Sequence, residues 1–555
     1  MKIKNILLLL APEESSLNFK KNIPPLSLGV IQSYLRKNDF DVIIKDLNIN
    51  LSNSFQEDTR SQWLSLFDSE FVFRNLKEEN NYNETDHLIG FLLKEINFDN
   101  IDFVGISIGG NFSLFEMHLA FLLGKLIKLK FNKPVAFGGT NIIYFYIFKE
   151  IYMDLWILVL RNFKYIFKGP AEISFAKLLK AISNENRDDG YLKLNGAIYY
   201  NNGEIVANED QVPSFSCPDF SGLNLGYYST CINLNDNKEN EKHFYKWPIP
   251  FNILASNINR DRFAISEKKE VNFIPYYFNF NCPYKCAFCE QSYEHKRTPC
   301  SKGAEDILED IKSMIQKYST KYFYFFNNTF NFTPSFVNEF CKRVIDQRVE
   351  FYWSDCARVN GLTYEMLELM YKAGCRKLIF GFETASEKLL KYVDKRLDII
   401  QLNKVLIWCK EIGIWADLEV IVGFPYEFED DFQATYRFII ENVKNINSFQ
   451  LNKYFIVPIS LMGMYPEKYD IKLTKVQDYN MILNRNKVNF EYNRGYDYDI
   501  GETNFHIFAF DEINGRPYTQ ILNESKDKVQ RMFKLLKALP TFKEAARFVS
   551  SYQSN

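Results

Sequence analysis

The sequence predicts an α/β protein in which two parallel β-sheet domains follow one another along the chain. Apolar strand-like runs alternate with amphipathic helical patterns, and each run ends in small or polar residues. The alternation stops near residue 185 and restarts at 273. A chain of 555 residues is long enough for several domains of about 100–200 residues each. We therefore expect a doubly wound sheet followed by a partial (β/α)6 barrel.

The first alternation covers residues 1–185. Strand patterns occur at 3–11, 40–46, 101–107 and 134–138, and helical patterns at 28–37 and 112–130. Residues 48–98 are polar and helical in pattern, as expected of an insertion. A short strand near Lys164 leads into Gly169 and a further helix, which closes the sheet. Strands and helices in this order predict a parallel sheet with helices on both faces.

The rest of the chain is expected to hold three segments. Residues 186–269 read as a linker of little regular structure with a hairpin at 196–207, because Asn202-Gly203 suits a tight hairpin turn. Residues 270–460 carry six strand patterns, at 273–280, 321–327, 350–354, 377–382, 416–423 and 447–457. The helical patterns between them lie at 304–317, 334–347, 363–373, 386–411 and 428–443. Residues 461–555 are expected to form a small α/β extension that caps the barrel, with a basic amphipathic helix at 526–538.

Composition narrows the class of protein. The net charge is −2 and charged residues of both signs are mixed, so nothing indicates the basic face that nucleic-acid binding uses. The apolar runs at 6–11 and 151–160 are shorter than the roughly 20 residues that span a bilayer, and no membrane association is expected. We expect a cytoplasmic protein whose ten cysteines are reduced.

Three of these cysteines form a motif. Cys282, Cys286 and Cys289 have the spacing C-x3-C-x2-C directly after the first strand of the second alternation. Three thiolates on one loop can ligate three irons of a cubane cluster and leave the fourth iron open for a ligand. A zinc site is the alternative, because Cys300 or His295 lies near enough in sequence to supply a fourth ligand.

The cysteine spacing, its place after a strand that opens a barrel, and the aromatic Phe288 before the third cysteine resemble the radical S-adenosylmethionine (SAM) superfamily over roughly residues 270–460. The resemblance implies a 4Fe–4S cluster on the three cysteines, which are then the catalytic and metal-binding residues. It also implies that SAM binds the open iron and is cleaved to methionine and a 5′-deoxyadenosyl radical, which takes a hydrogen atom from the substrate. An electron donor such as flavodoxin or ferredoxin is the implied partner.

Further residues at the predicted strand ends match places where such a barrel contacts SAM. Asn327 and Asn328 end the second strand, where many relatives have Asp, and Arg358 follows the third as a possible bidentate donor to a carboxylate. Glu383 in Gly381-Phe382-Glu383-Thr384 resembles the acidic residue that contacts the cofactor. Gly423 and Pro425 resemble the Gly-x-Pro-x-Glu turn beside the adenine. A surface salt bridge, a helix cap and an ordinary turn are the structural alternatives.

The first predicted domain has its own candidate site. Ser107, Gly138, Gly139 and Gly169 stand at or just beyond strand ends, where small residues let a ligand approach the backbone. With the Pro24–Gly29 turn, this Rossmann-like pattern resembles the cobalamin-binding domains of cobalamin-dependent radical enzymes. Residues 11–26 contain no histidine, so the resemblance implies cobalamin without a histidine lower ligand. Glycines that only make tight turns are the alternative.

The leading hypothesis is a cobalamin-dependent methyltransferase that methylates an unactivated carbon of a peptide or small natural-product substrate. A second hypothesis keeps the radical chemistry without methyl transfer, as rearrangement, epimerisation, cyclisation or sulfur insertion, with Cys356 or Cys375 as a possible hydrogen donor. A third is a non-catalytic sensor that uses the cluster or cobalamin.

Overall fold

A computed structural model describes most of the chain in eleven segments. These are residues 3–14, 23–54, 57–78, 81–109, 114–185, 189–228, 230–233, 268–291, 299–475, 479–491 and 508–538. The chain divides into two compact units. The first unit is Met1–Tyr228 with Gln477–Gly495, and the second is Ser229–Val476 with Tyr496–Asn555.

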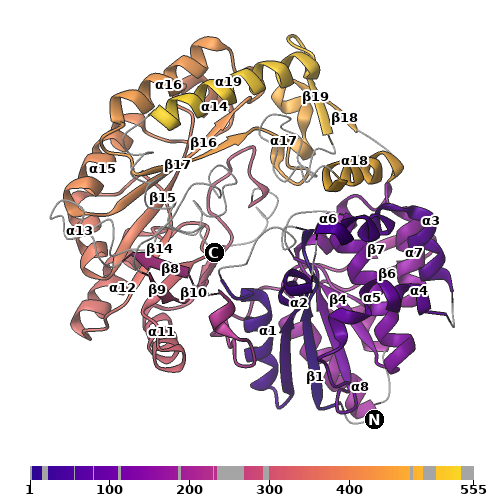
Figure 1. Ribbon diagram of the computed structural model, residues 1–555. Coiled ribbons are helices and arrows are strands. Elements are labelled where there is room, and N and C mark those ends of the chain that lie inside the picture. The colour runs from indigo at the N-terminus through magenta and orange to yellow at the C-terminus, as the bar shows by residue number, and fades with distance from the viewer. Residues whose placement is uncertain are drawn as a thin grey trace. The chain divides into compact units, whose positions relative to one another are not determined.

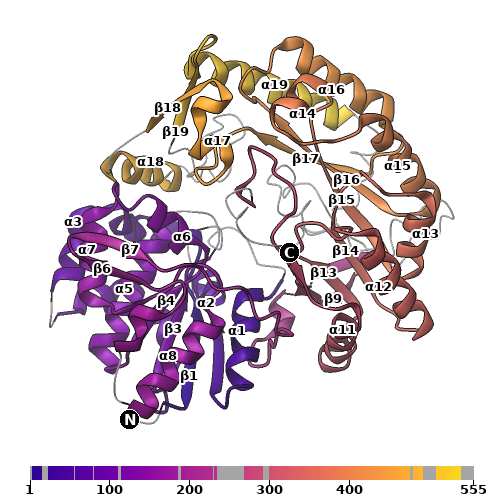
Figure 2. The same ribbon diagram turned by 180° about the vertical axis from the view of Figure 1, so that it is seen from behind.

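The first unit is built on a five-stranded parallel sheet, in indigo and purple in Figures 1 and 2. Its strands lie in the order β2-β1-β3-β4-β5, and every pairing is parallel. They are β1 (Asn5–Leu10), β2 (Asp41–Asp46), β3 (Phe103–Ser107), β4 (Val135–Gly138) and β5 (Tyr165–Ile166). This order confirms the predicted doubly wound sheet, because the chain reverses its direction of travel across the sheet after β2.

Helices cover both faces of this sheet. On one face α1 (Leu26–Arg36) and α8 (Glu172–Glu185) bury leucine and phenylalanine side chains against β1 and β3. On the other face lies α5 (Leu114–Phe131), whose Phe121 packs edge-on against Phe137 of β4. The insertion is helical, as predicted, with α2 (Leu47–Ser54), η2 (Glu57–Phe67), α3 (Ser69–Lys77), α4 (Asn83–Ile89) and η3 (Gly90–Leu93).

Three further segments belong to the first unit. The predicted hairpin is present as β6 (Ile198–Asn201) and β7 (Glu204–Ala207). Helices α6 (Thr140–Ile147) and α7 (Met153–Asn162) lie between β4 and β5. A late segment of the chain, α18 (Tyr479–Glu491), also packs here, through Phe490 against Phe67 and Phe115.

The second unit contains a curved six-stranded parallel sheet in the order β10-β13-β14-β15-β16-β17. The strands are β10 (Phe273–Tyr276), β13 (Tyr322–Phe325), β14 (Tyr352–Ala357), β15 (Cys375–Glu383), β16 (Trp415–Val422) and β17 (Ser448–Lys453). Consecutive strands are neighbours and all are parallel, which confirms the partial barrel. Its outer helices are α11 (Ala304–Tyr318), α12 (Pro334–Asp346), α13 (Tyr364–Lys372), α15 (Ile399–Ile412) and α16 (Glu429–Asn442).

Three predicted elements differ from the structure. The expected strand at 273–280 is two strands, since β11 (Asn279–Phe280) leaves the barrel and pairs antiparallel with β12 (Cys300–Ser301). The expected helix at 386–411 is also two elements, α14 (Glu387–Tyr392) and α15. The expected linker contains β8 (Thr230–Asn233), which pairs with β9 (Lys268–Val271).

The C-terminal region of the second unit packs on the barrel. It comprises α17 (Leu461–Met464), an antiparallel pair of β18 (Ile471–Lys475) and β19 (Phe508–Glu512), and α19 (Tyr518–Ala538). Ile471, Phe510 and Ile521 of this region share a buried cluster with Ala287 of the cysteine loop and Phe424. The predicted boundaries at 185, 269 and 460 stay predictions.

Candidate functional site

The three cysteines lie on one loop that follows β11. Cys286 is buried, whereas Cys282 and Cys289 are half-buried. The Cys289 amide donates to the Cys286 carbonyl at 3.1 Å, which folds the second half of the motif into a turn. Burial raises the pKa of the Cys282 thiol and raises that of Cys289 to about 12. Among the described residues no three His, Cys, Asp or Glu side chains are already arranged as metal ligands. The triad is therefore identified as a cluster site by its spacing and its surroundings.

Arg358, just after β14, contacts this loop instead of standing open to a ligand. Its guanidinium lies 3.5 Å from the ring centroid of Tyr284. One terminal nitrogen is 3.9 Å from Cys286 Sγ, and the other donates to the Lys395 carbonyl at 2.6 Å. A stacked guanidinium of this kind stabilises by about 0.5–2 kcal/mol. Arg358 thus braces the cysteine loop and places a positive charge beside the central thiol.

Backbone and aromatic contacts tie the cysteine loop to the ends of later strands. The Ala287 amide donates to the Val393 carbonyl at 2.8 Å, and the Met462 amide donates to the Ala287 carbonyl at 3.0 Å. Phe288 packs edge-on against Phe424, with ring centroids 5.6 Å apart. The predicted cysteine loop and the predicted Gly423–Pro425 turn are therefore in contact within one core.

Asn327 has a structural task next to the loop. Its side-chain oxygen accepts the amides of Phe278 and Asn279 at 3.0 Å each, and its nitrogen donates to Asp355 at 2.7 Å. Burial raises the pKa of Asp355 to about 8, although the donors from Asn327 and the Cys356 amide oppose the rise. Asn327 holds the segment leading into the cysteine motif. The neighbouring Asn328 lines a small pocket with Asn281, Pro283, Cys300 and other residues.

Glu383 ends β15 and is buried, and one of its two carboxylate oxygens has no hydrogen-bond donor among the described residues. Its φ is 62°, which is uncommon for a residue with a side chain. Oε1 pairs with Lys395 Nζ at 2.6 Å, and Gly381 leaves room for this pair, since an added Cβ would lie 2.7 Å from Oε1. The other oxygen, Oε2, is buried and has no hydrogen-bond donor among the described residues. A buried carboxylate with one oxygen left without a donor fits the expected contact with a polar group of the cofactor.

The turn after β16 is closed by its own last residue. Gly423 has φ 92°, in the left-handed region that glycine favours. The Glu427 carboxylate accepts the amides of Gly423 at 2.9 Å and Phe424 at 3.4 Å. Pro425 is buried within this turn. The turn stands at the carboxyl end of a barrel strand, where parallel α/β folds bind ligands.

The helix-free face of β14–β16 carries charged residues. Strand register places Cys356, Ile379 and Asp417 side by side on this face, with Gly381 beside Glu419. The opposite face packs on helices, as Phe382 stacks on Phe438 of α16. Lys377 and Asp417 are fully buried and pair at 2.5 Å. Cys356 is partly exposed, whereas Cys375 is buried at the start of β15, away from the carboxyl ends.

Glu419 is the acidic residue of this face that titrates near neutrality. Burial, with the negative charges of Glu383 and Asp417, raises its pKa from the ordinary 4.5 to about 7, against the opposing charges of Lys395 and Lys377. The Cys356 thiol also lies in this group, since Glu419 and Lys377 both act on it. Near pH 7 Glu419 can therefore donate or accept a hydrogen bond.

This pKa predicts how stability depends on pH. The folded-state pKa lies above that of the unfolded chain, so between about pH 4.5 and 7 the folded state holds a proton that the unfolded state releases. Stability therefore falls as pH rises, by at most about 3 kcal/mol from this group. We expect Glu419→Gln to remove this loss, so that its melting temperature exceeds that of wild type more at pH 8 than at pH 5. Glu411→Gln, exposed on α15, is the matched control. Parallel pH profiles for wild type and Glu419→Gln would contradict the assignment.

In the first unit, the small residues predicted for cobalamin meet at the carboxyl edge of the sheet. Ser107 ends β3 directly beside Gly138 of β4. Gly139 has φ 107°, and a Cβ there would overlap the Ile108 backbone. Asn141 lies just beyond, and its buried Oδ1 has no donor among the described residues. Gly169 follows the neighbouring strand β5, with φ 68°. Small side chains and one unsatisfied buried acceptor fit the approach of a flat ligand to this edge.

No described histidine is placed to serve as a lower ligand to cobalt. His118 is fully buried in α5, with Nδ1 2.6 Å from the Leu66 carbonyl and Nε2 2.8 Å from the Tyr479 hydroxyl. Burial lowers the pKa of His118 to about 4, so the ring is neutral. His87 belongs to α4 in the insertion. His295, considered above as a zinc ligand, lies outside the described residues, and Cys300 contacts the Phe280 carbonyl at 3.9 Å.

Comparison with known proteins agrees with these features. Residues 276–439 match the radical SAM superfamily. An uncharacterized methyltransferase of Pyrococcus horikoshii is 22% identical over 79% of this chain and 78% of its own. Cytidylyl-2-hydroxyethylphosphonate methyltransferase of Streptomyces wedmorensis is 20% identical over 78% of this chain and 77% of its own.

Two solved structures share the fold. TsrM from Kitasatospora setae, a radical SAM methyltransferase solved with cobalamin and a 4Fe–4S cluster, has a TM-score of 0.52 at 15% identity, covering 86% of this chain and 81% of its own. The cobalamin-dependent radical SAM enzyme OxsB, solved with aqua-cobalamin and SAM, has a TM-score of 0.58 at 15% identity, covering 98% and 70%. No helix in the described parts of this chain is long and apolar enough to cross a membrane. Residues 276–439 therefore match a radical SAM domain, and the chain shares its fold with two cobalamin-dependent radical SAM enzymes.

Proposed function

We propose that this enzyme is a cobalamin-dependent methyltransferase that acts on an unactivated carbon of a small-molecule or peptide substrate. The observation that carries the proposal is the presence, in one chain, of a radical SAM barrel and a parallel sheet whose carboxyl edge is lined by Ser107, Gly138 and Gly139. Sequence relatives support it, since two proteins named as methyltransferases match over more than three quarters of this chain.

Each group has a candidate set of holding residues. Cys282, Cys286 and Cys289 would hold the cluster. Glu383 and the Gly423–Glu427 turn would contact SAM, and the edge formed by Ser107, Gly138, Gly139 and Gly169 would receive cobalamin without a histidine ligand. When bound, the cluster supplies the electron that cleaves SAM, and cobalamin supplies the methyl group.

The chain's own residues prepare this chemistry. Lys395 pairs with Glu383 Oε1, which leaves Glu383 Oε2 without a donor among the described residues and so available to a cofactor group. Arg358 and Tyr284 hold the cysteine loop in place. Glu419, whose pKa of about 7 leaves it partly protonated near neutral pH, can donate or accept a hydrogen bond with a polar group of the substrate on the inner face of the barrel.

The substrate loses one hydrogen atom, which leaves in 5′-deoxyadenosine, and gains one methyl group from a second SAM. The first SAM also yields methionine, and the second leaves as S-adenosylhomocysteine. Two electrons come from an external donor such as flavodoxin or ferredoxin, and they neutralise the charges of the two sulfonium groups.

Methyl-labelled SAM tests this proposal without a known substrate. We expect protein loaded with cluster and cobalamin, under low-potential reductant, to transfer the label to its bound cobalamin and to form S-adenosylhomocysteine. Addition of the correct substrate should then give a labelled product. Formation of 5′-deoxyadenosine with all label left in SAM and methionine would instead favour rearrangement, epimerisation or cyclisation. Absence of any SAM cleavage would favour a sensor.

A further inference from the structure

The C-terminal helix α19 packs directly onto the turn that follows β16. Ser525 of this helix occupies the space above Gly423, so that a Cβ at Gly423 would overlap Ser525 Oγ. Ser525 Oγ itself donates to the Ile521 carbonyl at 2.6 Å, within the helix. Gly423 is therefore required both by its positive φ and by the close approach of α19.

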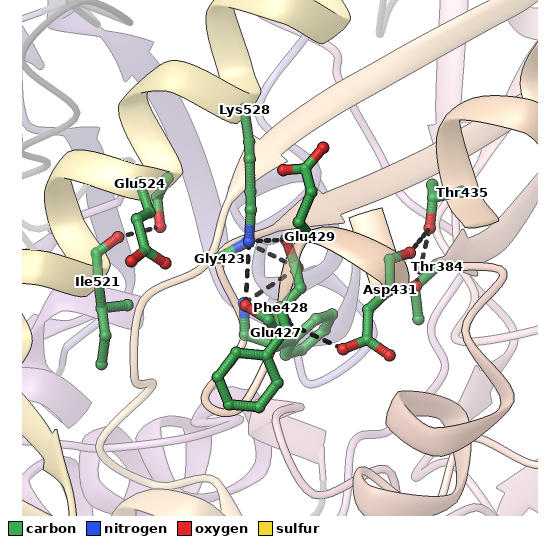
Figure 3. A network of polar contacts seen from close by, with 12 residues as sticks. Thr384, Gly423, Glu427, Phe428, Glu429, Asp431, Thr435, Ile521, Glu524 and Lys528 are labelled. Atoms are coloured by element: carbon green, nitrogen blue, oxygen red, sulfur yellow. Dashed lines mark hydrogen bonds and ion pairs between the residues drawn. The ribbon is translucent and has the colours of Figure 1, made fainter. Parts of the chain in front are cut away.

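Charged residues make this contact specific. Glu427 closes the turn from inside and is 2% exposed. Lys528 of α19, 3% exposed, places Nζ 2.9 Å from Glu427 Oε1 and donates to the Glu427 carbonyl at 3.0 Å. Figure 3 shows Lys528 reaching from α19 down to Glu427 beside Gly423. Burial raises the pKa of Glu427, whereas the charge of Lys528 opposes that rise.

The strand before α19 holds the other side of the turn. Glu512, at the end of β19, accepts the Tyr426 amide at 2.5 Å. Arg516 pairs with Glu512 at 2.5 Å and donates to the Glu427 carbonyl at 3.0 Å. The backbone and carboxylate of Glu427 are thus held by two cations that both come from the C-terminal region.

We infer that Lys528 is a positioning residue for SAM: α19, by pairing with Glu427, sets the conformation of the Gly423–Glu427 turn at the cofactor site. The turn stands at the carboxyl end of β16, where parallel α/β folds bind ligands. Its Phe424 packs against Phe288 of the cysteine loop. A shift of the turn would therefore move side chains next to the cysteines, where SAM has to bind the cluster. The C-terminal extension is accordingly part of the SAM site. The inference depends only on the SAM-binding part of the proposed function.

The same helix supplies a matched control. Arg531, three residues after Lys528, pairs with Glu429 at 2.8 Å, but both side chains are partly exposed, at 35% and 53%. Exposed ion pairs of this kind contribute little to folding stability, whereas a buried carboxylate that has lost its partner destabilises the folded protein strongly. Lys528→Met and Arg531→Met therefore remove one cation each from α19, with different expected effects on the turn.

The experiment measures SAM affinity by equilibrium dialysis on cluster-loaded protein, with iron and sulfide content and melting temperature determined alongside. We expect Lys528→Met to bind SAM at least about tenfold more weakly than wild type at unchanged iron content, with Arg531→Met within about twofold. The double variant Lys528→Met/Glu427→Gln, which removes the unpaired charge but keeps an acceptor for the Gly423 amide, should recover most of the affinity. SAM should also change the EPR signal of the reduced cluster, and this change should be weakest in Lys528→Met and close to that of wild type in Arg531→Met and in the double variant.

Two results would overturn the inference. One is a Lys528→Met protein that binds SAM within twofold of wild type, even if its melting temperature falls, because the pair would then only stabilise the fold. The other applies if Lys528→Met cannot hold the cluster. Recovery of both iron content and SAM binding in the double variant would then support the role of the charge pair. Failure of the double variant to recover either of them would reject the inference. These assays measure SAM binding and do not depend on methyl transfer, since no methyl acceptor is present. A protein that binds SAM but lacks cobalamin would therefore contradict the proposed function and leave this inference intact.

Discussion

Replacement of Cys286 by alanine is expected to abolish SAM cleavage. Cys286 is the central and most buried thiol of the motif, and Arg358 lies 3.9 Å from its sulfur. Without it only Cys282 and Cys289 of the loop remain as ligands, which cannot hold a cubane cluster with one open iron. We expect 5′-deoxyadenosine formation under strong reductant to fall by about 1,000-fold or more, which corresponds to over about 4 kcal/mol. Iron content should fall with it.

Cys300 provides the matched control for that experiment. It stands on β12, opposite Phe280, near the same loop in the sequence, and its thiol faces the Phe280 carbonyl. Cys300→Ala should keep the iron content and the rate of SAM cleavage within about twofold of wild type. Loss of metal from Cys300→Ala, equal to the loss from Cys286→Ala, would instead show a four-ligand site and would revive the zinc interpretation.

Lys377→Met is expected to produce the largest loss of stability in the barrel. The substitution leaves the fully buried Asp417 carboxylate without the ammonium that now lies 2.5 Å away. Removal of one partner from a buried pair typically costs about 3–5 kcal/mol. Hydrogen exchange measured by mass spectrometry on peptides of β15 and β16 reports the local opening free energy, which should fall by that amount.

Two further variants separate charge from packing in this prediction. Lys372→Met breaks an exposed pair with Glu368 on α13, where the side chains are 57% and 49% exposed, and should cost less than about 1 kcal/mol. Lys377→Met/Asp417→Leu replaces the pair by apolar side chains and should recover most of the loss. A Lys377→Met protein no less protected than Lys372→Met would show that the buried pair does not stabilise the sheet.

Hydrophobic periodicity was sufficient to predict both sheets, because each strand carries an apolar face that is independent of distant residues. Hydrophobic periodicity failed to predict the gap between α14 and α15, because the apolar pattern continues across it. Residues 386–411 are helical in pattern throughout, yet the chain leaves the helix after Tyr392, with positive φ at Asp394 and Arg396. The capping signal was present: Asp398 precedes Gln401 by three residues, and its carboxylate accepts the Gln401 amide.

That break contains a residue of the site that pattern analysis missed. Lys395, which lies within the helical pattern predicted for 386–411, is the cation that pairs with Glu383. Lys377 and Asp417 were missed for a related reason, since each stands on a different strand and only the register of β15 and β16 brings them together. The expected contact of Asn327 with the cofactor stays a prediction, and its hydrogen bonds to backbone amides of another segment could not be read from its position at a strand end.

The most direct test of cobalamin-dependent methyl transfer is the cobalamin content of the protein. The chain should be expressed with hydroxocobalamin, purified without oxygen and loaded with cluster, and its corrin should be quantified by absorbance and by mass after cyanide extraction. The proposed function predicts close to one cobalamin per chain, with a spectrum typical of cobalt without a histidine ligand. Protein that cleaves SAM but holds no corrin would contradict the account and assign the first unit to another task.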